Sequence, residues 1–488
     1  MQQPDGNISI ALTLVLCLLS AGCSLVPDYH RPQTDPAAAW NAGTVTTSAT
    51  AVAARRAWWR SFASPELDWL MARSLSSNFN LRAAVARVAE ADGTAEIDGA
   101  PLLPSLAVVG TQDQANGANN SGTHAIYAQA TYELDFWGKN RAAAASGAAL
   151  AHASAFDADT VAMTLSASIA DTYFQILSLG QRVRLARQIA GDARRVLALV
   201  QVQRGLGSAT DLQVEQQRAA VATFDAAVPM LQQQMEQATH LLAVLTGRAP
   251  EGFVVDAADL DDVARPDVLP DLPAALLERR PDIRAAEARL IAANFDIGVA
   301  RAAFFPTVSL TGAAGIGATS LSHFFPPAAV TDMGASLLQP LFQGGQLEGQ
   351  LRFSRARQVE LVATYRQTVI AAFQDVEDAL SELKHLRDQE AVEAVAEAAA
   401  RKAADLAQVQ YRLGSADYLT VLTMEQTLYQ TQDALLQLRL LRLQAIVGLF
   451  RALGGGFAAA EGAPTMEAGV PPAMRAGVSA GMLVPTKA

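Results

Sequence analysis

The chain has 488 residues, a formal net charge of −11 and a sequence pI of about 5.1. The acidic balance and the lack of a Lys/Arg-rich run argue against nucleic acid as a partner. The two cysteines lie near the N-terminus, the six histidines are scattered, and no Ser/His/Asp order, CxxC or phosphate-binding loop occurs. We therefore expect no enzyme, no metal site and no cofactor.

Residues 1–22 resemble a bacterial signal peptide. The apolar run Ile8–Leu19 is too short to span a bilayer but suits the apolar core of such a signal. The segment Leu19–Cys23 resembles the cleavage and lipidation box of bacterial lipoproteins, and Ser24 resembles the residue that sorts them to the outer membrane. Cys23 is thus the expected lipidation site. A plain secretory signal with an unlipidated Cys23 is the alternative, because no Lys or Arg precedes Arg31.

The first half of the chain follows a simple course. Residues 23–64 lack periodicity and predict an extended, lipidated N-terminal arm, and residues 65–250 form a first structural repeat. Helical periodicity begins near Pro65 and ends near Gly99, after which prolines break it. A strand hairpin follows, with strands at Leu106–Gly110 and Ile126–Leu134. A helix of roughly 60 residues is then expected over 138–203, a turn at Arg204–Asp211 and a returning helix over 211–247.

The second half repeats the first. Leu81–Gly110 resembles Ile283–Gly312, and Gln201–Leu212 returns as Gln408–Leu419, so each half is one structural unit. We assign residues 251–271 to a polar linker, 272–456 to the second repeat and 457–488 to a disordered tail. The repeat contains the hairpin Phe304–Ile316 with Thr331–Leu341, a long helix over 344–413 and a return over Asp417–Leu453. An apolar seam on that long helix should pack on neighbouring helices; it comprises Leu347, Leu351, Leu361, Tyr365, Ala372, Val376, Leu383 and Leu386.

Four strands of roughly ten residues match the length of tilted membrane-spanning strands. Four strands cannot close a barrel, since the smallest outer-membrane barrels need about eight. Open strand edges are not tolerated in lipid, so several chains must share one barrel, and three copies would supply twelve strands. The elements predict a mainly α protein with a β-barrel part. It is internally duplicated, and a homotrimeric, 12-stranded outer-membrane β-barrel continues into a long periplasmic α-helical barrel.

Several motifs in a fixed order resemble one family. They are the segments Gly22–Pro32, Ala57–Trp59, Glu133–Gly138, Leu276–Leu290, Ile297–Gly312, Gln339–Gly345 and Leu449–Gly456. Together they are similar to the TolC-like outer-membrane efflux factors, in particular their lipoprotein branch. The resemblance implies a passive exit duct in the outer membrane that extends into the periplasm and conducts small toxic compounds or drugs. A periplasmic adaptor protein would join it to an inner-membrane, proton-driven efflux pump. The alternatives are an outer-membrane channel for type I protein secretion and a periplasmic coiled-coil scaffold without a pore.

The resemblance also implies site residues. The two turns would form the periplasmic tip that docks with the adaptor, through Leu206, Gly207, Ser208, Leu413, Gly414 and Ser415. As structure alone, the glycines need only serve a helix reversal. Just beyond the second turn, Leu419, Thr420 and Thr423 would form the periplasmic gate, with Leu419 as a threefold apolar constriction. The alternative for Leu419 is ordinary seam packing. Trp137 fits either an interfacial aromatic belt or core packing.

Overall fold

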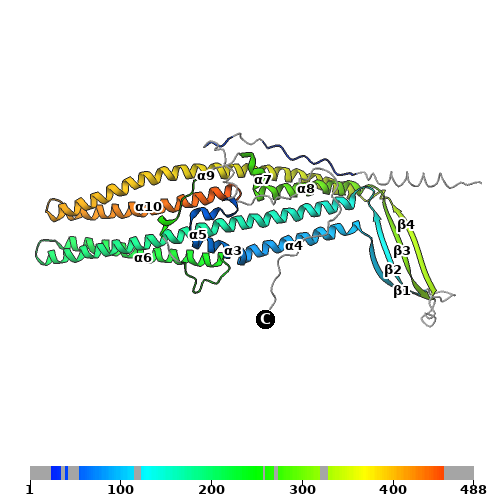
Figure 1. Ribbon diagram of the computed structural model, residues 1–488, viewed down its shortest axis with the longest axis horizontal. Coiled ribbons are helices and arrows are strands. Elements are labelled where there is room, and N and C mark those ends of the chain that lie inside the picture. Colours follow the sequence, from blue (N-terminus) through cyan, green and yellow to red (C-terminus); the bar gives the residue numbers. More distant parts are fainter. Residues whose placement is uncertain are drawn as a thin grey trace, which may run out of the picture.

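Two helices of 67 residues each run along an elongated molecule and lead to a four-stranded sheet at one end (Figure 1). The computed structural model describes residues 24–34, 39–41, 54–114, 122–255, 259–268, 273–318 and 328–455. The helices are η1 (Ala54–Phe62), α3 (Pro65–Ser77), α4 (Phe79–Gly99), η2 (Ala100–Leu102), α5 (Lys139–Gly205), α6 (Asp211–Leu245), η3 (Leu260–Asp262), η4 (Pro273–Ala275), α7 (Leu276–Arg279), α8 (Pro281–Ala302), α9 (Gln346–Arg412) and α10 (Tyr418–Ala452). The strands are β1 (Ser105–Gln114), β2 (Gly122–Leu134), β3 (Thr307–Ala318) and β4 (Ala328–Leu338).

The long helices α5 and α9 begin in the same way. Each follows a glycine in the left-handed region, Gly138 with φ of 72° and Gly345 with φ of 86°. At a rise of 1.5 Å per residue, each helix is about 100 Å long. Each then reverses into a return helix of 35 residues, α6 or α10. The repeated order of elements and the mainly helical content confirm the predicted fold class, an internally duplicated and mainly α protein with a β part.

The strands form one antiparallel sheet in the order β1-β2-β3-β4. The hairpin of the first repeat therefore joins that of the second through β2 and β3, with Ile126 opposite Ile316. Each strand is several residues longer or shifted relative to the sequence-based boundaries, because pairing with a neighbour extends it beyond its apolar core. Strands β1 and β4 are the edges of this sheet.

The single helix expected over residues 65–99 is wrong: it is divided at Asn78. The Asn78 side chain accepts a hydrogen bond from the Leu81 amide at 3.0 Å and caps the start of α4. Its amide group also donates to the Leu245 carbonyl at the end of α6 at 2.9 Å. A residue that caps one helix and contacts another is better placed outside a continuous helix.

The main core lies midway along the molecule, where η1 packs between α5 and α10. Trp58 stacks on Phe450 with ring centroids 5.2 Å apart, and Phe62 lies 4.9 Å from Phe174. Trp58, Phe62 and Phe174 are at most 2% exposed. Truncating such a side chain to Ala typically costs about 3–5 kcal/mol, so η1 anchors the N-terminal segment to both repeats.

The segment between the repeats is more firmly packed than a polar linker should be. Phe253, Leu260 and Val263 are buried in the main core. Asp261 accepts a hydrogen bond from Arg439 of α10 at 2.9 Å. The buried apolar residues of this segment are irregularly spaced, so no periodic pattern indicated that they would be buried.

Six of the eight seam residues expected on α9 are buried, from Leu361 to Leu386, whereas Leu347 and Leu351 are half-buried. The predicted tail over 457–488 lies outside the described residues. None of the helices in the described part of the chain combines the length and apolarity that a membrane crossing requires.

Candidate functional site

The sheet has two chemically different faces. Directly paired residues project to the same side, so the register assigns every side chain to one face. One face carries the bulky apolar residues Leu106, Val108, Ile126, Leu310, Met333 and Leu337. The opposite face carries the polar residues Gln129, Thr131, Glu133, Thr311, Asp332 and Ser336. Strands of 10 to 13 residues with this alternation fit a wall between lipid and water.

The apolar face is open to the surroundings in a single chain. Val108 is 77% exposed and Met333 is 92% exposed. The edge strands β1 and β4 also keep unpaired backbone groups. In hydrocarbon such groups cost several kcal/mol each, so a lipid environment requires that further strands cover both edges.

The two turns at the far end of the molecule share one hydrogen-bond pattern. The Ser208 amide donates to the Gln203 carbonyl at 2.8 Å, and the Ser415 amide donates to the Gln410 carbonyl at 2.9 Å. Each serine hydroxyl bonds to the same carbonyl, at 3.0 and 3.1 Å. The repeated serine therefore completes the helix end, a structural role that the sequence did not reveal.

Gly207 and Gly414 both have φ of +76°, which L side chains rarely adopt. A Cβ atom at either position would meet no heavy atom within 4 Å. The backbone conformation, rather than lack of space, therefore selects glycine. The leucines before them, Leu206 and Leu413, are 78% and 77% exposed. Each turn therefore presents one exposed leucine side chain next to a glycine whose surroundings are open.

The expected gate residues begin helix α10. Asp417 caps this helix by accepting a hydrogen bond from the Thr420 amide at 2.8 Å. The Leu419 side chain is 54% exposed, whereas Tyr418 is 1% and Leu422 is 8% exposed. Within one chain the helical seam is therefore packed by the neighbours of Leu419 and not by Leu419 itself.

Two tyrosine hydroxyls join the hairpin α5/α6 to the hairpin α9/α10 near the turns, and a third hydrogen bond ties α6 to α5. The Tyr418 hydroxyl donates to Gln217 Oε1, and Gln217 Nε2 donates to the Ala193 carbonyl at 2.7 Å. The Tyr411 hydroxyl donates to Gln203 Oε1 at 2.9 Å. Burial raises the pKa of Tyr418 above its ordinary value, so this phenol stays a donor.

A bidentate ion pair joins the same hairpins nearer the middle of the molecule. Arg182 of α5 contacts Asp433 of α10 at 2.6 and 3.0 Å. Both side chains are less than a fifth exposed. Separation of the two hairpins would have to break this pair as well as the tyrosine contacts.

These bridging residues were not predicted, although the sequence around Gln217 contains one indication of them. Gln217 follows Val214 and precedes Val221 and Phe224 at helical seam spacing. A fully buried amide on an otherwise apolar stripe needs a polar partner from another element.

The N-terminal arm lies along α8. The Arg301 side chain donates to the Leu25 carbonyl at 3.1 Å, and Asn294 donates to the Pro27 carbonyl at 2.7 Å. Arg31 pairs with both oxygens of Glu287, at 2.6 and 2.8 Å. The described arm thus leads toward the end of α8 that adjoins the sheet. Cys23 itself lies outside the described residues.

Trp137 joins the two repeats at the junction between sheet and helices. Its indole Nε1 donates to the Pro306 carbonyl at 2.8 Å, and its ring stacks on Phe305 at 4.7 Å. These contacts show that Trp137 is packed between the two repeats within one chain. Across the described residues, no group of three or more His, Cys, Asp or Glu side chains is arranged to hold a metal ion.

Both the sequence and the fold of this chain match those of known proteins. The family model described as outer membrane efflux protein matches residues 70–248 and 272–455. The chain belongs to the outer membrane efflux protein family. It is the outer-membrane component of an efflux system, and part of it extends into the periplasm. The family excludes a coiled-coil scaffold without a pore.

Individual members of the outer membrane efflux protein family match over most of their length. The pyoverdine export outer membrane protein OpmQ of Pseudomonas aeruginosa is 41% identical over 82% of this chain and 88% of its own. The probable efflux pump outer membrane protein TtgC of Pseudomonas putida is 31% identical over 95% of this chain and 98% of its own. The crystal structure of the open state of the MtrE channel of Neisseria gonorrhoeae superposes with a TM-score of 0.81. That comparison covers 89% of this chain and 99% of MtrE, at 28% identity.

Proposed function

We propose that three copies of this chain form one continuous exit duct. The observation that supports this proposal most directly is the four-stranded sheet with one apolar face and two unpaired edges. Joining β4 of each copy to β1 of the next removes every edge and gives a closed barrel of twelve strands. The apolar face then meets lipid, and the polar face lines a water-filled lumen.

The long helices offer matching surfaces for the same arrangement. On α4, below β1, Val85 is 58% and Ile97 is 72% exposed. On α9, below β4, Val359 is 70% and Ile370 is 61% exposed. Packing α9 of one copy against α4 of the next would bury both sets and continue the barrel as a helical cylinder.

At the periplasmic end, the exposed side chains of Leu206 and Leu413 support docking of a helical adaptor protein. The turns that present them are shaped by Gly207, Ser208, Gly414 and Ser415. The adaptor would connect the duct to a proton-driven pump in the inner membrane. Leu419 from three copies would narrow the duct there, with Thr420 and Thr423 beside it.

We also assign lipidation to Cys23. The docked arm supports this assignment, because Leu25 is held by Arg301, one residue before the end of α8. Acyl chains on Cys23 would then enter the membrane beside the barrel. The cargo would be small toxic compounds or drugs. Pyoverdine, which appears in the name of OpmQ, is the first alternative cargo to measure.

Planar bilayer recording of the purified protein tests this function. We expect discrete channels whose conductance rises in the Leu419→Ala variant, since a smaller side chain widens the constriction. The matched control is Leu441→Ala, which truncates a 42% exposed leucine elsewhere on α10. A correctly folded protein that gives no channels would contradict a duct. Channels unaffected by Leu419→Ala would place the constriction elsewhere.

A further inference from the structure

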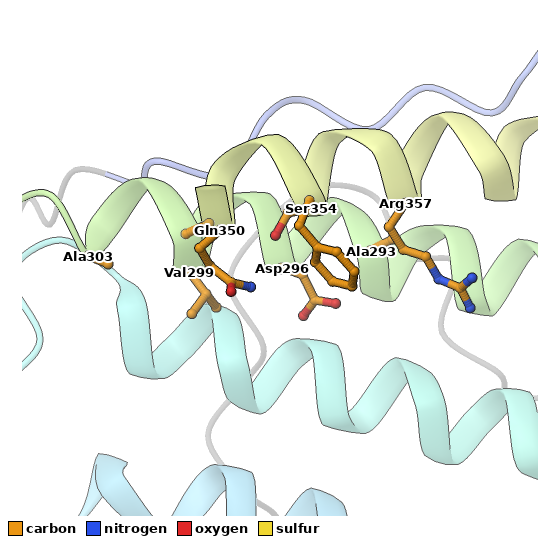
Figure 2. A pocket seen from close by; sticks show the side chains of 9 residues that line it. Ala293, Asp296, Val299, Ala303, Gln350, Ser354 and Arg357 are labelled. Atoms are coloured by element: carbon orange, nitrogen blue, oxygen red, sulfur yellow. The ribbon is translucent and has the colours of Figure 1, made fainter. Parts of the chain in front are cut away.

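A cavity of about 270 Å³ lies between α8 and α9, close to the sheet. Farther from the sheet the two helices are in contact through Leu290, Ala293 and Leu361. Asp296, Gln350 and Arg357 are among the residues that line the cavity (Figure 2). The volume approaches the lower end of the range typical of small-molecule sites.

The cavity opens on the side of α8 opposite to the N-terminal arm. Asn294 and Arg301, seven residues apart, share the face that holds the arm. Asp296 lies roughly 200° around the helix from Asn294. Figure 2 shows Asp296 and Gln350 pointing away from the arm. Because the arm leads to Cys23, the membrane anchor proposed above, its side of α8 would face the outside of the duct, and the cavity would open into the lumen.

The lining carries one unneutralised charge. Asp296 uses Oδ1 to accept a hydrogen bond from Ser146 Oγ at 2.7 Å, and no cation in the described part of the chain pairs with it. Arg357, by contrast, is paired with Glu360 at 2.6 Å. The remaining carboxylate oxygen of Asp296 is therefore open to a cation, while Glu360 offsets the charge of Arg357.

An aromatic ring lies beside this carboxylate. Phe353 lines the same cavity and is 64% exposed. The cavity floor contains small residues, including Ala293 and Ser354, which are at most 4% exposed. A ring face attracts cations and stacks on other aromatic groups, so the lining combines two features that recognise the same kind of molecule.

We propose that this cavity is a lumenal binding station for aromatic cations on their way through the duct. The proposal rests on the trimeric duct proposed above and names a substrate class for it. The cation pairs with the free oxygen of Asp296, and the aromatic part stacks on Phe353. Three such stations in the trimer form a ring at the end of the helical cylinder next to the β-barrel, where they retain compounds before these enter the barrel.

Channel block by ethidium in planar bilayers tests the proposal. Ethidium should reduce the wild-type current at lower concentrations than tetraethylammonium, a cation without aromatic rings, or anilinonaphthalene sulfonate, an aromatic anion. Asp296→Asn and Phe353→Leu should each raise the half-blocking concentration of ethidium about fivefold, because each removes one charge or ring contact. Asn at position 296 keeps an acceptor for Ser146, which protects the local structure.

The control variant is Asp332→Asn, which removes a carboxylate from the polar face of the sheet and should leave ethidium block within twofold of wild type. Equal block in wild type, Asp296→Asn and Phe353→Leu would overturn the station. So would an equal effect of Asp332→Asn, which would indicate a general lumenal charge. Failure of the duct is a separate result, since the wild-type protein would then give no current at all.

Discussion

The Tyr418→Phe substitution should open the periplasmic end of the duct. It deletes the hydroxyl that donates to Gln217 Oε1 and leaves this oxygen, on a residue that is 0% exposed, without that donor. An unsatisfied buried acceptor costs about 1–3 kcal/mol. If opening separates the hairpins and lets water reach Gln217, that cost falls on the closed state alone.

The loss of closed-state stability should be larger in a trimer, because each of the three subunits contributes to it. Three subunits that open together lose at least about 3 kcal/mol of closed-state stability, which corresponds to a roughly hundredfold shift in the equilibrium between closed and open channels. Single-channel recording measures this shift as the ratio of open to closed time. Tyr411→Phe should act in the same direction but less strongly, since Gln203 is only partly buried.

Tyr429→Phe is the matched control for this prediction. Tyr429 lies on the same helix and packs edge-on against Phe224, with ring centroids 5.8 Å apart. Removing its hydroxyl should leave gating unchanged. If Tyr418→Phe behaves like Tyr429→Phe in a correctly assembled protein, the bond between Tyr418 and Gln217 does not hold the closed state.

Further predictions concern the tips, the constriction, the core and the anchor. Gly207→Glu or Gly414→Glu should abolish drug resistance while the protein still reaches the outer membrane, because each strains a turn with positive φ; normal resistance in both would refute docking there. Leu419→Asp should raise conductance and favour cations, as three like charges repel near the axis; reversal potentials measure this selectivity. Burial raises the pKa of Asp171 to about 7, so its stability contribution is complete in acid and is lost as the pH rises toward 7. Asp171→Asn should therefore raise Tm at pH 8 and change it little at pH 4. Cys23→Ala should end palmitate incorporation without preventing channel assembly.

The long helices and turns could be predicted from sequence because their determinants are local. Gly207 and Gly414 mark reversals through their own backbone freedom, and the apolar spacing from Leu361 to Leu386 identifies a buried seam. Duplication strengthened the turn signal, because the same Leu-Gly-Ser-Ala run occurs at both reversals. The same local information predicted the sheet, since alternation along each strand encodes its two faces.

Contacts between distant segments could not be predicted in this way. The division at Asn78 depends on the Leu245 carbonyl, and docking of the arm depends on Glu287, 256 residues beyond Arg31. The bond between Tyr418 and Gln217 requires a particular register of two hairpins. None of these partners has a sequence pattern that identifies the other.

The stoichiometry of the membrane-extracted protein tests the central proposal most directly. Native mass spectrometry of the detergent-solubilised protein should give the mass of three chains, each carrying lipid on Cys23. This outcome is expected because β1 and β4 leave edges that only further copies can close. A stable, folded species of one or two chains in the membrane extract would contradict the shared barrel and, with it, the duct.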